Sequence, residues 1–335
     1  MESVKAVGGT ADEVLAFAPA GEALAPEKGR LSRKGSQMLV NRWLDAAGIT
    51  DPVIRHCYTV CAREVSGIDG GHGRWVPLRI APAAARPHTA ALVAHACRAD
   101  ARADSGPIEE RQRRLASFAE ATWAAFAAGG SHDPVLHATV HTYRTFGMPL
   151  SLIEDMFTAM QRDVDFRDFA TYAELRQWAT QMTGSPAYGI TWAMAGTELT
   201  EAQPLLREFA ELFQLADVLC DLSEDLDDGR LYLPLEDLNQ FGVHPEDVKA
   251  KRWTPAMADL IAFEAARVTD RLPAVAPELQ RTPVGPFIQV LDEHCRLLVA
   301  GLLAAGQDVL HRPVQPPVGD FLNVYRPLMR AVIPC

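Results

Sequence analysis

The 335-residue sequence lacks several features that would each define a class of protein. No apolar run reaches the roughly 20 residues needed to span a bilayer. Residues 1–20 show no apolar core behind basic residues, as a secretory signal peptide would. The net charge is −11, so the basic excess typical of a nucleic-acid-binding surface is missing. We therefore expect a soluble, cytoplasmic protein with no nucleic-acid partner. Peripheral contact with a membrane and the oligomeric state are left open.

Cysteines in metal-binding or disulfide patterns are also lacking. The six cysteines are scattered along the chain, and only Cys57 and Cys61 lie close together. Without a second pair they do not predict a zinc site. We expect reduced and mostly buried thiols, in keeping with a cytoplasmic protein.

Strand-like alternation, linkers and internal repeats are scarce, whereas apolar residues recur at helical spacing through most of the chain. This pattern predicts an all-α protein with one helical domain over residues 36–335, after a loosely ordered N-terminal extension at 1–35. The expected helices cover 36–47, 84–98, 108–128, 133–145, 149–163, 172–182, 187–195, 203–223, 245–250, 255–272, 285–305 and 319–330. Gly129 and Gly147 mark loops between them. Residues 66–77 read as a tolerated surface insertion or as a lid carrying Trp75.

The most informative stretch runs from Gln214 to Pro234. Asp217, Asp221 and Asp225 recur every four residues between apolar neighbours, so a helix stacks them on one face. Like charges at this spacing destabilise a helix. A chain that keeps them on a partly buried helix is expected to neutralise them with a cation, and Mg²⁺ suits carboxylate oxygens. For Glu224, Asp227 and Asp228 we favour a solvated helix end before Gly229.

The same stretch resembles the second aspartate-rich motif of the squalene/phytoene synthase family. That motif has Gln, Asn, Arg and Asp-x-x-x-Asp, followed by Gly-Arg-x-Tyr-x-Pro. This chain has Gln214, Asp217, Cys220, Asp221, Asp225, Gly229, Arg230, Tyr232 and Pro234. Segments 160–175, 182–185 and 306–314 are similar to further landmarks of the family, in the right order. The resemblance runs from about residue 56 to residue 313.

The resemblance implies a helical bundle of the isoprenoid-synthase type, with two acidic clusters at one end of a central apolar cavity. It implies a Mg²⁺-dependent enzyme that ionises an allylic prenyl diphosphate, the donor substrate. Asp221 and Asp225 are then metal ligands and catalytic residues, and Gln214 lines the site. Asp217 stands where the family has Asn, so it is a further metal ligand or a catalytic proton acceptor.

The remaining site residues are carried over by position. Asp100 and Asp104 are the candidates for the first acidic cluster, although they also fit a solvated helix end. His56 and Thr59 fall where the family contacts phosphate. Arg230 and Tyr232 match its diphosphate-binding pair, although Arg230 could instead cap a helix. Arg98 is a further phosphate donor.

Two departures bear on the reaction. Cys220 replaces the family's Arg, and Gln181 replaces a Tyr, in the region that would hold a second diphosphate. We therefore expect transfer of the prenyl group to a small aromatic acceptor in secondary metabolism. The alternatives are head-to-head condensation of two prenyl diphosphates, cyclisation of one, or a catalytically inactive partner subunit. Paired carboxylates argue against the last.

Overall fold

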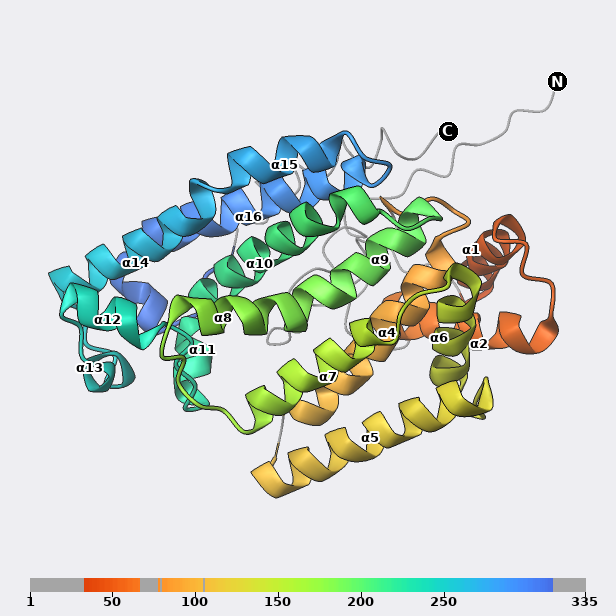
Figure 1. Cartoon of the computed structure of the whole chain (residues 1–335), viewed down its shortest axis with the longest axis horizontal. Helices are drawn as coiled ribbons and strands as arrows, with labels where there is room; N and C mark the ends of the chain where they lie inside the picture. The colour runs from red at the N-terminus through yellow and green to blue at the C-terminus, as the bar shows by residue number, and fades with distance from the viewer. Residues whose placement is uncertain (1–32, 67–77, 79, 105, 316–335) are drawn as a thin grey trace.

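The computed structural model describes residues 33–66, 78, 80–104 and 106–315, and every regular element in those ranges is a helix. The elements are α1 (Arg33–Ala46), α2 (Pro52–Ser66), α4 (Arg86–Ala103), α5 (Ile108–Ala128), α6 (Pro134–Phe146), α7 (Ser151–Val164), α8 (Tyr172–Ala179), the π-helical turn η2 (Thr180–Gly184), α9 (Ser185–Ala195), η3 (Thr200–Ala202), α10 (Gln203–Cys220), α11 (Leu222–Asp227), α12 (Leu235–Phe241), α13 (Pro245–Lys249), α14 (Pro255–Thr269), α15 (Leu272–Gln280), α16 (Gly285–Ala305) and η4 (Gly306–Leu310). The predicted all-α bundle is confirmed (Figure 1).

Helix α10 runs through the middle of the bundle. It packs on α14, α15 and α16 on one side and on α8, α9 and η2 on the other (Figure 1). Helix α9 also contacts α4, which in turn packs on α2, α5, α6 and α7. Buried side chains of these helices form a large apolar cluster and a smaller one between α1, α2, α4 and α6. Ile190 packs against both clusters, so the described residues share one continuous core.

Helix ends follow the signals in the sequence where glycine supplies them. Helix α5 ends at Ala128 and α6 at Phe146, each followed by a glycine in the left-handed region. The φ values are +78° at Gly129 and +66° at Gly147, where a side chain would be strained. Both predicted loops are confirmed.

The helix predicted at 203–223 is interrupted. Helix α10 ends at Cys220, Asp221 has non-helical dihedrals (φ −94°, ψ 8°), and α11 continues at Leu222. The short helix α11 stops before Gly229, whose φ is +77°. The predicted stop at this glycine is therefore confirmed, while the break at Asp221 was not predicted.

Helix α2 is missing from the helices predicted from the sequence, and so is α15. Helix α15 carries Pro273 near its start and Pro277 in its interior, and proline removes a backbone donor and normally ends a helix. Tertiary packing overrides that preference, because Leu272, Val275 and Leu279 are buried.

Some predictions lie outside the described residues. These are the extension up to residue 32, residues 67–77 with Trp75, and the helix at 319–330. Helix α1 begins at Arg33, slightly before the predicted domain start at residue 36. No helix in the described part of the chain is long and apolar enough to cross a membrane.

Candidate active site

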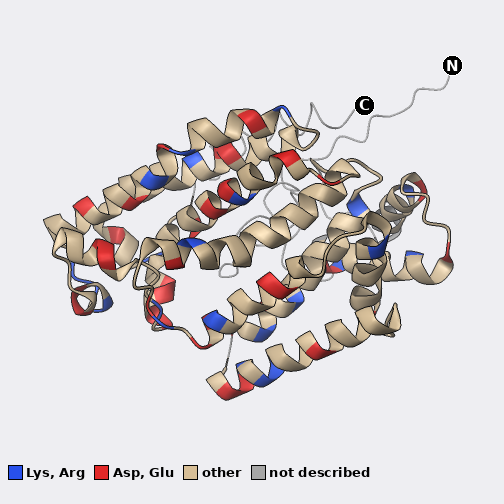
Figure 2. Cartoon of the chain, in the orientation of Figure 1, with Lys and Arg blue, Asp and Glu red and all other residues tan. Residues whose placement is uncertain are grey.

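Three carboxylates line one face of the α10–α11 junction, which we call the acidic face: Asp217, Asp221 and Asp225. The amide of Asp221 donates to the Asp217 carbonyl (2.9 Å), and that of Asp225 to the Asp221 carbonyl (3.0 Å). These bonds preserve the four-residue spacing across the break at Asp221. The three residues are half-buried, whereas Asp227 and Asp228 are exposed. Figure 2 shows the acidic residues gathered on α11.

Burial and mutual repulsion raise the pKa of two of these carboxyls. Desolvation, followed by the charges of Asp217 and Asp225, raises the pKa of Asp221 to about 8. Desolvation also raises the pKa of Asp225 to about 7, although Arg230 opposes it. Carboxyls with such pKa values gain from a nearby cation, which would favour their charged forms.

A fourth carboxylate, Asp163 at the end of α7, faces the same region. Its charge raises the pKa of Asp225. Its own pKa is raised to about 6, chiefly by burial, and it accepts a hydrogen bond from the Tyr232 hydroxyl (2.8 Å). Asp163 was not among the predicted site residues, although it lies in segment 160–175, which resembles the family. Only its place next to the acidic face marks it as a site residue.

The two aspartates predicted as the first cluster lie in different surroundings. Asp100, on α4, is half-buried, and its charge contributes to the raised pKa of Asp163. Asp104 caps the C-terminus of α4 and is exposed. The structure therefore brings Asp100 toward the acidic face through Asp163 and leaves Asp104 at a solvent-exposed helix end.

Arg230 supplies a cation at this site. Its guanidinium lies 3.4 Å from Asp225 and 2.9 Å from Asp228, and its side chain is 19% exposed. Its Nε is buried and has no hydrogen-bond partner among the described residues. Arg230 therefore keeps one donor beside the carboxylates for a further acceptor, as a phosphate oxygen would be.

Gln214 lies beside the acidic face. Gln181 lies on the turn that packs against α10. Gln214 accepts a hydrogen bond from the Thr183 hydroxyl and donates to Asp217 over 3.4 Å. Thr183 and the half-buried Gln181 belong to η2, the π-helical turn that interrupts the helix predicted at 172–182. Such turns are frequent at functional sites.

Arg98, predicted as a phosphate donor, is paired with two carboxylates in the structure, and its role toward phosphate stays a prediction. Its Nη1 donates to both carboxylate oxygens of Asp133 at 2.8 Å, and its Nε donates to Glu64 at 2.9 Å. Its Nη2 also bonds Glu64. The guanidinium thus ties α4 to α2 and to the N-cap of α6, and its donors are engaged within the protein. The sequence does not show these pairings, because both carboxylates lie far from Arg98 along the chain.

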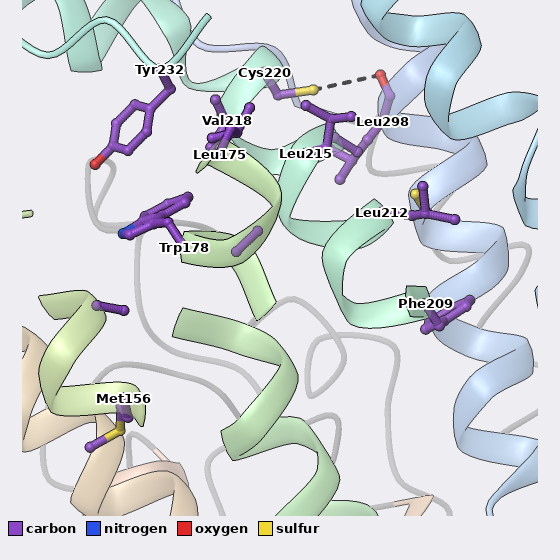
Figure 3. Close-up of a cluster of buried hydrophobic side chains, with 14 of the residues drawn as sticks. Met156, Leu175, Trp178, Phe209, Leu212, Leu215, Val218, Cys220, Tyr232 and Leu298 are labelled. Atoms are coloured by element: carbon purple, nitrogen blue, oxygen red, sulfur yellow. Dashed lines mark hydrogen bonds between the residues drawn. The ribbon is translucent and has the colours of Figure 1, made fainter. Parts of the chain in front are cut away.

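The side chain of Cys220 lies at a contact between two helices. Its thiol is buried and points to the carbonyl of Leu298 on α16, with the sulfur 3.7 Å from that oxygen (Figure 3). The pKa of the thiol is raised by burial. Cys220 is therefore part of the α10–α16 interface, and its place near the substrate stays a prediction.

The roles predicted for His56 and Thr59 stay predictions. Both lie on α2, where His56 is exposed. Thr59 is buried, and its hydroxyl donates to the Arg55 carbonyl at 2.8 Å, a bond within its own helix.

Aromatic side chains are packed around Tyr232. The ring of Tyr232 lies 4.9 Å from Trp178 and 5.0 Å from Phe166, between centroids, and stacks on Phe169 at 6.0 Å. In Figure 3 Tyr232 and Trp178 lie on the opposite side of Val218 from Leu298. A pocket of about 10 Å³ between α8 and α10, lined by Trp178 and Gln214 among others, has room for roughly one water molecule. An open pocket of about 700 Å³ lies beside the end of α7, lined by Arg162 and Asp165 among others. A central apolar cavity for the prenyl chain stays a prediction.

The donor set fits Mg²⁺. Hard cations prefer carboxylate oxygens, and Mg²⁺ commonly takes one or two carboxylates and completes its octahedron with water and substrate phosphates. The acidic face and Asp163 offer carboxylates whose charges repel one another, which a cation would relieve. Within the described ranges, no group of three or more His, Cys, Asp or Glu side chains is already arranged as a ligand set. The fit of Mg²⁺ to this site therefore rests on the chemistry of the carboxylate ligands.

Several known proteins are similar to this chain. A family model described as squalene/phytoene synthase matches residues 70–320. "Bifunctional protein CrtB/UppS" of Streptomyces coelicolor is 30% identical over 204 residues, which make up 60% of this chain and 36% of that protein. "Presqualene diphosphate synthase" of Rhodopseudomonas palustris is 26% identical over 255 residues, 74% of this chain and 90% of that protein. The matches with the first four curated relatives span only 31% to 61% of those relatives' lengths.

A solved structure extends the likeness to the fold. The crystal structure of squalene synthase HpnC from Alicyclobacillus acidocaldarius superposes with a TM-score of 0.63 at 25% identity. The superposition covers 80% of this chain and 99% of that one. With a family model matching well over half of its length, the chain belongs to the squalene/phytoene synthase family.

Proposed function

We propose that this protein is a Mg²⁺-dependent prenyltransferase of secondary metabolism that ionises an allylic prenyl diphosphate and transfers the prenyl group to a small aromatic acceptor. One observation carries the proposal: the acidic face lies beside Arg230, whose buried Nε is unpaired among the described residues. Carboxylates next to a free phosphate donor suit a substrate that combines a metal ion with a diphosphate.

The donor's leaving group is the part of the substrate that this site would hold. Asp221 and Asp225 would bind Mg²⁺, with Asp163 and Asp100 on the facing helices. When bound, the metal neutralises the charge that develops on the diphosphate oxygens. Arg230 would donate to those oxygens and stabilise the same charge.

The allylic cation that remains needs apolar and aromatic surroundings without water. Trp178 and Phe166 pack around Tyr232, whose hydroxyl bonds Asp163, and aromatic rings attract a cation. Asp217 would take the proton that an aromatic acceptor releases after the prenyl group is attached.

The supply of cations favours one diphosphate over two. Among the described residues, Arg230 and Arg162 are the cations whose charges oppose the raised pKa of Asp163. Arg98 is engaged by Glu64 and Asp133, and Cys220 and Gln181 bring no charge. A second diphosphate would add several negative charges, and residues 220 and 181 supply no positive charge to meet them.

Head-to-head condensation is the alternative, and the names of relatives favour it. "Presqualene diphosphate synthase" matches 74% of this chain, and several other relatives are named phytoene synthase. Such a reaction joins two prenyl donors and needs no other acceptor.

Product analysis separates the two functions. The purified protein is incubated with Mg²⁺ and C5, C10, C15 or C20 allylic diphosphates, each with and without an electron-rich aromatic compound. We expect little coupled product from any donor alone and a carbon-prenylated compound when the aromatic is present. Efficient conversion of one donor into presqualene diphosphate, squalene or phytoene would overturn the proposal in favour of condensation.

A further inference from the structure

The π-helical turn η2 is the feature on which the inference rests. The amide of Ser185 donates to the carbonyl of Thr180, five residues earlier, which defines a π-type turn. One extra residue in a helical turn rotates the side chains that follow relative to those before it. The side chains of Thr183 and Ser185 therefore point in other directions than they would if α8 continued as a regular α-helix.

Two hydroxyls near the C-terminal end of this turn are bonded to different helices. The Ser185 hydroxyl donates to Asp155 on α7. The Thr183 hydroxyl donates to Gln214 Oε1 on α10. The two backbones come close, because a Cβ added at Gly184 would lie 3.7 Å from the carbonyl oxygen of Arg207 on α10.

The carboxylate of Asp217 selects one orientation of the Gln214 amide, because it can only accept a hydrogen bond. With Oε1 accepting from Thr183, the amide NH₂ faces Asp217 and donates over 3.4 Å. The flipped amide would set its carbonyl oxygen against a carboxylate, which repels it. Asp217 thus sets the orientation of the amide, and the Thr183 hydroxyl anchors its other end by donating to Oε1.

Both partners of Gln214 depart from the family pattern. Thr183 stands at the Ala of the segment that 182–185 resembles, and Asp217 stands at the Asn of the aspartate-rich motif. An Asn can meet either end of an amide, and an Ala imposes nothing. A carboxylate accepts only the NH₂ end, so a hydroxyl donor at residue 183 becomes useful once residue 217 is Asp.

We propose that Thr183 is a positioning residue, which fixes the Gln214 amide toward Asp217 and thereby holds the Asp217 carboxylate in place on the acidic face. Its effect on turnover rests on the proposed function, whereas its effect on Gln214 does not. Thr183 acts through Gln214 and is not itself required to touch substrate.

Substitutions in η2 test this arrangement. Thr183→Val replaces the hydroxyl by a methyl group of similar size, and Thr183→Ser restores a hydroxyl. Thr180→Val is the matched control, because Thr180 belongs to the same turn but donates to the Arg176 carbonyl. Two readouts are needed: the side-chain amide signals of Gln214 by NMR, assigned with Gln214→Glu, and kcat and KM for the prenyl donor.

In Thr183→Val we expect the Gln214 amide protons to exchange with water about tenfold faster, and kcat to fall about tenfold with KM nearly unchanged, as loss of one hydrogen bond implies. Thr183→Ser should recover both, and Thr180→Val should change neither. Unaltered Gln214 signals in Thr183→Val would overturn the proposal, and so would an unaltered kcat or an equal loss in Thr180→Val. If the parent protein turns over no donor, the proposed function fails, while the NMR comparison still decides the placement of Gln214.

Discussion

At the scale of single residues, the acidic face contains carboxylates that destabilise the metal-free fold. Asp221 and Asp225 are half-buried near other carboxylates, and their pKa values are raised to about 8 and about 7. A carboxyl group whose pKa is higher in the folded state than in the unfolded chain loses its stabilising effect as the pH rises. Above the pKa of the unfolded chain, its ionisation favours unfolding. Residues with this property are expected where a ligand relieves the repulsion.

This linkage predicts how the stability of the metal-free protein depends on pH. Unfolded aspartate ionises near about pH 4, so the stabilisation present below that pH is lost as the pH rises toward 7 and 8. We expect the melting temperature to fall over this range, and Asp221→Asn to remove much of the fall. Mg²⁺ with pyrophosphate should raise the melting temperature of the parent protein by binding the folded state.

The control for this experiment is Asp227→Asn. Asp227 lies on the same short helix, but its side chain is 68% exposed and pairs with Lys251. A pH dependence of the melting temperature that is equally steep in the parent protein and in Asp221→Asn would contradict the interpretation of the acidic face.

The first cluster gives a second prediction at this scale. Because Asp100 lies within electrostatic reach of Asp163 and Asp104 is exposed, Asp100→Asn should reduce Mg²⁺-dependent turnover about tenfold or more. Asp104→Asn should change stability by no more than about 0.5 kcal/mol and leave turnover close to that of the parent. Steady-state kinetics over a range of Mg²⁺ concentrations measures both. An equal loss in the two variants would restore the original pairing of both aspartates as ligands.

At the scale of elements, the candidate site lies at two irregular junctions between helices. The break at Asp221 separates α10, which is held in the core, from α11, in which Leu222 and Ser223 are buried and Glu224 and Asp227 are exposed. The π-helical turn η2 lies alongside α10 and contacts Gln214. Neither irregularity is visible in the apolar periodicity, because both sequences continue a helical pattern through the irregular residue.

The α10–α16 interface provides a test of where residue 220 points. Cys220 is 3% exposed and faces the Leu298 carbonyl. Cys220→Arg, which restores the residue of the family motif, should lower the free energy of unfolding by about 3 kcal/mol or more, because it buries an unpaired charge. Cys220→Ala should cost about 1 kcal/mol. Urea denaturation measures both. A stable Cys220→Arg variant with tighter diphosphate binding would show instead that residue 220 faces the site.

At the scale of the whole molecule, the sequence was a good guide to the helices and to the acidic face. The spacing of Asp217, Asp221 and Asp225 depends only on local helix geometry, which four residues are enough to reveal. Asp163 and the partners of Arg98 come from other helices, so their places depend on packing that one sequence does not show. Helix α15 was missed because its prolines mislead a local argument.

The central claim is that the acidic face and Arg230 release diphosphate from an allylic donor with the help of Mg²⁺. The most direct measurement is the rate of inorganic diphosphate release from such a donor by the parent protein, Asp225→Asn and Asp227→Asn, with and without Mg²⁺. We predict metal-dependent release by the parent and by Asp227→Asn, and a loss of about 100-fold or more in Asp225→Asn. Release that is independent of Mg²⁺, or that persists in Asp225→Asn, would contradict the account.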